Sequence, residues 1–376
     1  MNCAKDRCYR YESIFAHASF QFCGHIDEYL IANTRRLVLL YCQPRFGEHS
    51  HLLRRFDEGT LVEERKIGSS QNILGYYWLW FLHNIQELWR FTRGCKVKTI
   101  VFCGHPVAFF GMSFVKLFRN VTYAYWIGDY FPVKRTIIRA YEAVKRFYHG
   151  KMDFAYYLSD GINRVFNGGN LIETESHRTV MWGLRPFKDC AFVRAGTKRL
   201  LFVGLLREGQ GVDRLLEFVA QNHAYSLVLV GVAANGYEKE IQADIDRHNM
   251  ADRVYFRNRF HSETELRDIA KTCFCGVALY DLGRDNFTHY ADPGKVKAYM
   301  ELGLPVVMTR ISGVVAFVER FGAGVVVDSI DNLGAAIARI AANAQGFNDG
   351  VSAFNAYFDY ETYYERSFKA MEGVWK

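Results

Sequence analysis

The composition is that of a folded chain: of 376 residues, 50% are apolar and 23% are charged. It excludes overall disorder, and the 6 prolines and 31 glycines exclude a collagen-like or low-complexity chain. Lysine and arginine outnumber aspartate and glutamate by 47 to 40, a lean toward anionic partners that is too small to indicate a nucleic-acid-binding protein. The length favours two domains over one.

The cysteines and the N-terminal residues bear on location. The nine cysteines are scattered, without CxxC pairs, which favours a reducing cytosol. The first twenty residues hold no continuous apolar stretch, so we expect no targeting peptide. The most membrane-like stretch, residues 99–115, contains Gly104-His105-Pro106 and therefore predicts strand, turn and helix. We expect a cytoplasmic protein and leave open whether it attaches to the inner face of the cell membrane.

Short β-branched runs alternate with helix-length amphipathic stretches along the whole chain, which predicts parallel sheets wound by helices. In the first half, the strands are expected at residues 37–41, 99–103, 121–126 and 154–158. Between the first two lies a predicted helix with one apolar stripe, formed by Trp78, Phe81, Leu82, Ile85 and Trp89.

The second half repeats the pattern more clearly, so two similar doubly wound domains are predicted. The strands are expected at residues 199–203, 226–230, 254–256, 276–280, 305–308 and 324–327. The join falls within residues 183–196, which hold a proline and two glycines. After Ala341, a loop containing Gly346 and Gly350 is expected to lead into one last helix over residues 357–375.

Residues 290–307 carry the strongest motif in the chain. Asp292 and Pro293 are expected to cap a helix, Lys295 lies in its first turn, and Gly303 ends it before a buried strand. A lysine in a first turn opposes the helix dipole unless an anion docks beside it. A bound phosphate group is one interpretation, and a merely solvated lysine is the other.

A second possible phosphate site lies earlier in the chain. A strand that ends at Gly204, a polar loop containing Arg207 and a helix start would present backbone N–H groups to an anion. The spacing after Gly204 matches neither a dinucleotide-binding fingerprint nor a P-loop.

Taken together, these segments resemble the C-terminal half of GT-B glycosyltransferases. The resemblance rests on residues 202–213, 227–231, 253–256 and 292–307. It implies an α/β GT-B fold: two Rossmann-like doubly wound domains that face a cleft, with a C-terminal helix crossing back to the N-terminal domain. The implied domains are residues 1–190 for the acceptor, 191–345 for the nucleotide sugar and 346–376 for the returning helix.

The motif Asp-Pro-x-Lys with Gly-Leu-Pro is more similar to bacterial exopolysaccharide glycosyltransferases of the xanthan glucuronosyltransferase type. Two glutamates of the large retaining family would fall on Tyr290 and Ala298, and Leu205 and Gln210 also depart from that family's glycine-rich turn. The resemblance therefore favours an inverting transfer, while a retaining transferase of the same pathway and a non-catalytic glycan- or nucleotide-binding scaffold stay as alternatives.

In that enzyme type, a carboxylate after the strand that matches residues 121–126 is the general base, and the matching residue here is Asp129. An inverting transfer needs such a base within hydrogen-bond reach of the acceptor hydroxyl. Asp129 could instead cap the helix that follows. His105 is the rival base, or a loop hydrogen bonder, and Glu48 could contact acceptor or donor.

The leaving diphosphate must be met by positive charge, and GT-B enzymes generally use helix ends and basic side chains for this purpose. The expected donor-binding residues are Gly204, Arg207, Tyr290, Asp292 and Lys295, with no metal and no cofactor besides the nucleotide sugar, for which UDP is our first choice. Asp244-Ile-Asp246 lies in a polar helix and is interpreted as a solvated face.

Two basic segments leave alternatives open. Arg257 follows a strand whose exit resembles the base-binding loop of the family, although surface arginines are usually only solvated. Residues 134–151 hold six cations and one acid interleaved with apolar residues. Such a helix could lie on an anionic membrane surface or pack on its own domain. A saccharide on a polyprenyl diphosphate as acceptor would make membrane contact useful.

Overall fold

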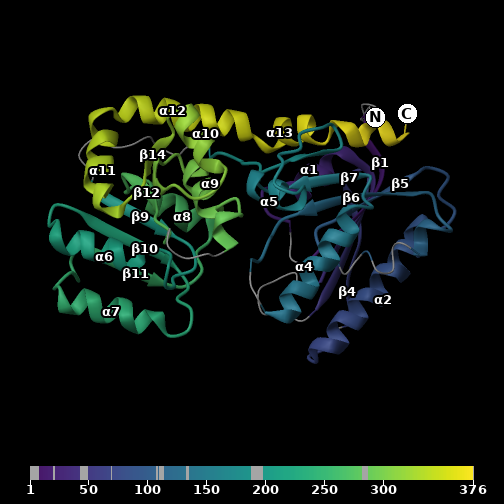
Figure 1. The fold of residues 1–376 in the computed structure, drawn as a ribbon, viewed down its shortest axis with the longest axis horizontal. Helices are drawn as coiled ribbons and strands as arrows, with labels where there is room; N and C mark the ends of the chain where they lie inside the picture. The colour runs from purple at the N-terminus through teal and green to yellow at the C-terminus, as the bar shows by residue number, and fades with distance from the viewer. Residues whose placement is uncertain are drawn as a thin grey trace, which may run out of the picture. The chain divides into compact units, whose positions relative to one another are not determined.

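The chain forms two compact units in the computed structural model (Figure 1). Unit 1 comprises Met1–Gly183 and Tyr360–Lys376, and unit 2 comprises Leu184–Asp359. The structure describes residues 8–19, 22–42, 50–68, 70–106, 109, 114–132, 135–187, 198–281 and 287–375.

The joins between the units lie at 183/184 and 359/360, whereas the sequence suggested 190/191 and 345/346. Backbone hydrogen bonds from Leu184 to Phe358 and from Phe187 to Glu301 explain the first difference, because they tie the connecting segment to unit 2. The chain returns to unit 1 at Tyr360, as expected of a returning helix. The acceptor and donor roles of the two units stay predictions.

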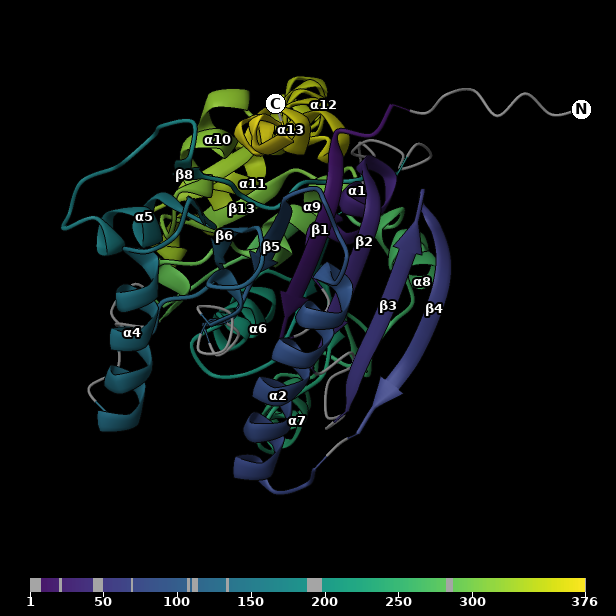
Figure 2. The ribbon, with the colours of Figure 1, turned by 90° about the vertical axis from the view of Figure 1, so that its right-hand side faces the viewer.

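The described residues of unit 1 form an eight-stranded sheet with the order β4-β3-β2-β1-β5-β6-β7-β8. Its pairs are parallel except at one edge, where β3 pairs antiparallel with both β2 and β4 (Figure 2). The strands are β1 (Tyr11–Ala18), β2 (Thr34–Tyr41), β3 (His51–Asp57), β4 (Thr60–Ile67), β5 (Thr99–Cys103), β6 (Val121–Ile127), β7 (Phe154–Tyr157) and β8 (His177–Thr179).

Four of these strands, β1, β3, β4 and β8, were not predicted from the sequence. In β3 and β4 the residues are largely charged, and they lie at an edge where one face meets water. Arg54 on β3 donates from Nε to Glu64 Oε2 on β4 at 2.7 Å, so opposite charges meet across the two strands. Only the pairing partner shows why a charged run is extended.

The helices of unit 1 flank this sheet. They are α1 (Ile26–Asn33), α2 (Ile73–Thr92), α4 (Thr136–His149), α5 (Asp160–Phe166) and α13 (Tyr360–Ser367), followed by the 3-10 segment η3 (Lys369–Trp375). Within the described ranges, no helix combines the length and apolar character needed to span a bilayer.

The last segment of the chain is fastened to unit 1 by specific bonds. The Tyr364 hydroxyl donates to the carbonyl of Gly24 at 2.6 Å, and the Trp375 indole donates to the carbonyl of Lys98 at 2.7 Å. Phe368 is buried among aromatic rings, including that of Phe102. Residues 360–375 are therefore part of the unit 1 core.

In unit 2, the described residues form a parallel six-stranded sheet with the order β11-β10-β9-β12-β13-β14. All six strands were predicted from the sequence, with bounds that differ by two residues at most. They are β9 (Arg199–Val203), β10 (Ser226–Gly231), β11 (Val254–Asn258), β12 (Cys275–Ala278), β13 (Val306–Thr309) and β14 (Gly324–Val327).

The helices of unit 2 complete a doubly wound domain. They are α6 (Val212–Gln221), α7 (Tyr237–Arg247), α8 (Glu263–Ala270), α9 (Gly294–Glu301), α10 (Val314–Phe321), α11 (Leu333–Ala342) and α12 (Ala344–Phe358), with the short 3-10 turns η1 (Phe287–His289) and η2 (Ile330–Asn332). The largest part of the core packs α6, α7 and α11 on one face of the sheet.

The loop expected around Gly346 and Gly350 is wrong, since both residues lie inside α12. A Cβ at Gly350 would lie 2.3 Å from the carbonyl oxygen of Gly322, at the end of α10. Glycine here allows two helices to approach closely, and the sequence pattern could not distinguish this use of glycine from a loop.

The strand orders locate the places where ligands bind in such sheets. In unit 1 the chain moves outward in opposite directions from β1 and β5, and in unit 2 from β9 and β12. In doubly wound folds, ligands bind beside the carboxyl ends of the strands at this switch point.

Candidate active site

Two glycines shape the carboxyl ends of β9 and β10. Gly204 has φ +140° and Gly231 has φ +144°, values that side chains rarely allow. A Cβ on Gly231 would lie 1.8 Å from the Gly204 carbonyl oxygen, so the two backbones touch. A Cβ on Gly204 would lie 3.6 Å from Cε of Lys295. The glycine predicted at this turn is therefore required by its backbone conformation, and it lies beside the lysine of the motif at residues 290–307.

The hydroxyl of Tyr299 on α9 holds the strands at the switch point. It accepts a hydrogen bond from the Val203 N–H at 2.9 Å and donates to the Val277 carbonyl at 3.0 Å. These two bonds link β9 to β12 where the strands begin to diverge. The same residue positions α9, so the place of Lys295 is determined by the core.

Lys295 extends from the first turn of α9 to these strand ends. Its Nζ donates to Gln210 Oε1 at 2.9 Å and lies 4.1 Å from the ring centroid of Phe202 and 4.7 Å from that of Tyr280. Burial, and secondarily the positive charge of Arg207, lower the pKa of Lys295 to about 7. This enclosure argues against a merely solvated lysine.

The charge on Lys295 is not balanced by a carboxylate of the described residues, and the charge beside it is also positive. Among the residues that the structure describes, no carboxylate forms an ion pair with its amine. Two cations, Lys295 and Arg207, thus lie close together at the switch point. An anion bound there would favour the protonated amine and offset the repulsion between them.

The polar loop after β9 adds backbone donors to this group. Gln210 is buried, and Gly211, with φ +77°, precedes α6 without a side-chain cap. A Cβ on Gly211 would lie 2.6 Å from the Leu279 carbonyl oxygen, which brings the loop close to the end of β12. Gln210, which bonds Lys295, is thus the residue directly before the N-cap of α6, and the N–H groups of a first helical turn can bind an anion.

Asp292 does not cap α9, which corrects the sequence prediction. The N-cap is Pro293, and no side chain bonds there. Asp292 is buried instead, with Oδ2 3.7 Å from Nζ of Lys297, and the same amine lies 3.3 Å from the ring centroid of Phe358. Burial lowers the pKa of Lys297 to about 8, opposed by Asp292. This geometry favours a packing role for Asp292, whose assignment to substrate stays a prediction.

Tyr290 and Gly303 border the same motif. Tyr290 is partly buried, just before the segment that enters α9. Gly303 has φ +73° and follows the end of α9, so its predicted role as the helix terminator is confirmed.

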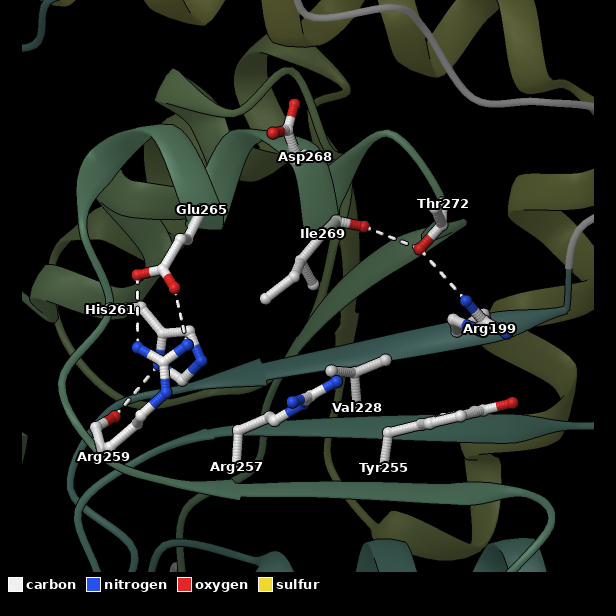
Figure 3. Close-up of a pocket in the computed structure, with 10 residues that line it drawn as sticks. All are labelled: Arg199, Val228, Tyr255, Arg257, Arg259, His261, Glu265, Asp268, Ile269 and Thr272. Carbon is white, nitrogen blue, oxygen red and sulfur yellow. Dashed lines mark hydrogen bonds and ion pairs between the residues drawn. The ribbon is translucent and has the colours of Figure 1, made fainter.

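Arg257 lines a different pocket of unit 2, of about 390 Å³, beside β9, β10, β11 and α8 (Figure 3). Arg257 and Tyr255 extend over the same face of the sheet. Arg199 donates to Thr272 Oγ1 at 3.2 Å and lies 4.7 Å from the ring centroid of Tyr255. Within the described chain, the Arg257 guanidinium has no such partner. Its contact with a nucleotide stays a prediction.

Asp129 and His105 come together in a pocket of about 170 Å³ in unit 1. The pocket lies at the carboxyl ends of β1, β5 and β6, and its lining also includes Ser19, Cys23, Tyr141, Lys145 and Trp182. The N-cap of α4 is Arg135, so Asp129 does not cap this helix, which was its alternative role.

A buried lysine accompanies Asp129. Lys145 Nζ donates to the backbone carbonyl of Asp129 and to Glu142 Oε1, the latter at 3.0 Å. The Asp129 side chain is open to solvent on one side, yet its enclosure in the pocket raises the pKa of the carboxyl, and Lys145 opposes the shift. A carboxyl with a raised pKa at a pocket mouth is suited to accept a proton.

His105 lies between two aromatic side chains. Its ring centroid is 4.5 Å from that of Trp80 on α2 and 5.5 Å from that of Tyr141 on α4. Burial and, secondarily, Lys145 lower the pKa of His105 to about 3. An imidazole with so low a pKa is a weak base at neutral pH, so Asp129 is the better candidate.

The sequence did not indicate the buried pair beside Asp129, of which Lys145 lines the pocket. Lys145 counted among the cations of an exposed face, and Glu142 was its one acid, but both are buried. Their spacing of three residues on a helix was the available signal. Glu48, predicted to contact a substrate, lies outside the described residues.

The fold defines the class of protein. Two units with parallel sheets, each with a polar group at its switch point, and a C-terminal segment that packs on the first unit constitute the GT-B fold of glycosyltransferases. Residues 197–343, which make up most of unit 2, match the family described as glycosyl transferases group 1. A search of curated proteins finds no match.

Solved structures agree with this class. Sucrose-phosphate synthase from Thermosynechococcus elongatus is 12% identical with a TM-score of 0.70, over 96% of this chain and 99% of that one. HepE from Anabaena, in complex with UDP-glucose, is 15% identical with a TM-score of 0.64, also over 96% and 99%. At these identities the likeness establishes the fold alone.

A third similar structure is a mutant of TarM from S. aureus in complex with fondaparinux, alpha-GlcNAc-glycerol and UDP. It is 13% identical with a TM-score of 0.59 over 86% of this chain. The chain spans 64% of the length of that protein. The family match of residues 197–343 supports a glycosyltransferase, and these structures support its fold.

Proposed function

We propose that the protein transfers a sugar from a nucleotide diphosphate sugar, with UDP as the nucleotide, to a lipid-linked saccharide in surface or exopolysaccharide biosynthesis. The nucleotide is suggested by HepE and TarM, whose structures contain UDP-glucose and UDP. The acceptor and the pathway rest on the resemblance of residues 292–307 to bacterial exopolysaccharide enzymes.

The observation that carries the proposal is the environment of Lys295. A lysine amine with a pKa near 7, beside Arg207 and without a carboxylate partner in the described chain, is suited to the charge that grows on a leaving diphosphate. Donors that are already in place stabilise this charge without reorganisation during the reaction. Gly204 and Gly211 have φ values of +140° and +77°, so the backbone of this turn takes a conformation that side chains rarely allow.

Asp129 is the base in this proposal, and the transfer inverts the anomeric configuration. It would take the proton of the acceptor hydroxyl as the sugar moves to that oxygen. Lys145 holds the Asp129 backbone and favours the ionised carboxylate. His105, neutral at physiological pH, would orient the acceptor in the same pocket.

A first experiment identifies the donor. Thermal unfolding of the protein with UDP, GDP, ADP and their sugars should single out one nucleotide, because a ligand at 100 times its dissociation constant stabilises the folded state by about 2.7 kcal/mol. NMR of the product with the stabilising sugar nucleotide then reports the anomeric configuration. An inverted product supports Asp129 as base, and a retained one supports the alternative of a retaining transferase.

A second candidate function is a non-catalytic GT-B-like protein that binds a glycan or nucleotide. It is favoured by Tyr290 and Ala298, which stand where the large retaining family has its paired glutamates. The same experiment separates it from an enzyme, since it predicts stabilisation by a nucleotide sugar with no turnover.

A further inference from the structure

Helix α2 of unit 1 is apolar on both of its sides. One side packs Tyr76, Trp80 and Leu88 into the unit. The other side carries the stripe noted in the sequence, where Leu74 and Trp78 leave 78% and 60% of their surfaces exposed. No residue from 73 to 86 has a formal charge. An exposed helix face of this composition is typical of an interaction surface.

Residues 114–118 extend this apolar surface. Phe114, Leu117 and Phe118 are all exposed, Leu117 to 76%. The ring centroid of Phe118 lies 6.1 Å from that of Trp89 on α2. The two elements therefore contribute to one continuous surface.

Helix α4 supplies positive charge next to α2. Its one acid, Glu142, is buried with Lys145. On the outer side, Ile137 and Phe147 are 79% and 58% exposed. The exposed cations of this helix and its ends are Arg135, Arg139, Arg146 and Lys151. The two sides of α4 therefore differ. Tyr148 is buried, as expected for a helix that packs on its own domain. Ile137, Phe147 and the four cations are exposed, as expected for a helix that lies on a membrane surface.

Helices α2 and α4 both reach the pocket that holds Asp129. The two helices run in similar directions in unit 1 (Figures 1 and 2), and His105 lies between a side chain of each. Near the start of α2, Tyr77 stacks on Trp80 with ring centroids 5.9 Å apart, and Trp80 contacts His105 in the pocket. Tyr141 of α4 contacts His105 from its other side.

We propose that this surface, formed by the outer sides of α2 and α4 and by residues 114–118 and called the docking face below, binds an anionic lipid bilayer. Exposed apolar side chains, together with the four exposed cations of α4, complement an acyl layer beneath negative head groups. A protein partner would have no need for this charge pattern to adjoin the acceptor pocket. The inference deepens the proposed function and rests on it for the identity of the acceptor, which would be presented to Asp129 from the bilayer.

The test is sedimentation of the full chain with vesicles, in the absence of any donor. Vesicles of phosphatidylcholine with about 30% phosphatidylglycerol should bind the protein, and phosphatidylcholine alone should bind it much more weakly. Exchanging Leu74→Ser and Trp78→Ser together should weaken binding at least tenfold, because two apolar side chains are lost from the buried area. Exchanging Arg139→Gln and Lys151→Gln should weaken it about fivefold per cation.

Matched variants keep the test specific. Leu61 and Val62 are exposed apolar residues on β4, so Leu61→Ser with Val62→Ser should leave vesicle binding unchanged. Unchanged thermal unfolding would show that each variant is folded. The proposal is overturned if the Leu74/Trp78 variant binds like the wild type, if the wild type ignores anionic vesicles, or if the variant instead dissolves a dimer of the wild type.

Catalysis gives an independent readout. With a water-soluble acceptor saccharide, the Leu74/Trp78 variant should retain wild-type turnover. With an acceptor embedded in vesicles, its turnover should be at least tenfold lower than that of the wild type. Absence of all turnover alongside intact vesicle binding would remove the proposed function and leave the docking face standing.

Discussion

The switch point of unit 1 lies between β1 and β5 and carries Asp129, while that of unit 2 lies between β9 and β12 and carries Lys295. The two places are equivalent in their sheets, yet their charges differ. The acid of unit 1 lies beside Lys145, a buried cation. The cation of unit 2 lies beside a second cation, Arg207.

The difference in neighbouring charge indicates which reaction step each site is suited to. Lys145 favours an ionised Asp129, so the unit 1 site can take up a proton. Burial and, secondarily, repulsion from Arg207 destabilise a charged Lys295, so we propose that the unit 2 site takes up an anion. Equivalent positions in two similar sheets thus acquire opposite tasks from their neighbours. Each prediction below tests one side of this comparison.

The largest effect is expected from Asp129→Asn. Loss of the base should lower kcat by about 10²- to 10⁴-fold. Stabilisation by UDP should stay at the wild-type value, because the change lies in unit 1 only. Full activity of this variant in a transferase assay would remove Asp129 as the base.

The next effect is expected from Lys295→Met. Loss of a donor to the leaving diphosphate should lower kcat/KM by about 10²- to 10³-fold and abolish most of the thermal stabilisation by UDP. Stabilisation of the wild type should also fall between pH 6.5 and 8.5, as an amine with a pKa near 7 loses its proton. The variant should lack this dependence.

A matched control for Lys295 is Lys271→Met. Lys271 is an exposed lysine that pairs with Asp268 at 2.9 Å on the surface of the same unit. This change should alter neither activity nor UDP binding. Equal losses of activity and UDP binding in both variants would mean that the Lys295 effect comes from the lower net charge of the protein and not from a specific contact.

A smaller effect, visible as a pH profile, is expected from Lys145→Met. Lys145 lowers the pKa of Asp129, so its removal should raise that pKa and shift the acid limb of kcat/KM to higher pH. Activity should therefore decline more at pH 6 than at pH 8. The exposed neighbour Arg139→Met is the control on a soluble acceptor. A uniform loss at all pH values would indicate only a structural role for Lys145.

The smallest effect concerns stability. The pKa of His105 is lowered to about 3, so below pH 6.5 the unfolded chain binds a proton that the folded chain does not. Stability should fall as the pH drops, by up to about 2 kcal/mol from this residue between pH 7 and 5. In urea unfolding, His105→Gln should show a shallower dependence on pH, whereas the exposed His223→Gln should match the wild type.

The two units also differed in how far the sequence predicted them. In unit 2 every strand was predicted, because short β-branched runs that are buried on both faces have few other possible structures. In unit 1 the charged strands β3 and β4 were not predicted. The apolar stripe of α2 was predicted, but not whether it faces the core or the solvent. Local periodicity shows that a helix has an apolar stripe, but not whether the stripe meets the core or the solvent.

The order of the elements in unit 2 and the candidates Lys295 and Gly204 came from local patterns in the sequence, and the GT-B class and the candidate Asp129 came from the resemblance to known enzymes. Only the tertiary structure decided that Lys295 lacks an acid, that Asp129 has Lys145 beside it, and that α2 exposes Leu74 and Trp78. Charge environment and burial are set by residues far apart in the chain, and a pattern along the chain does not contain them.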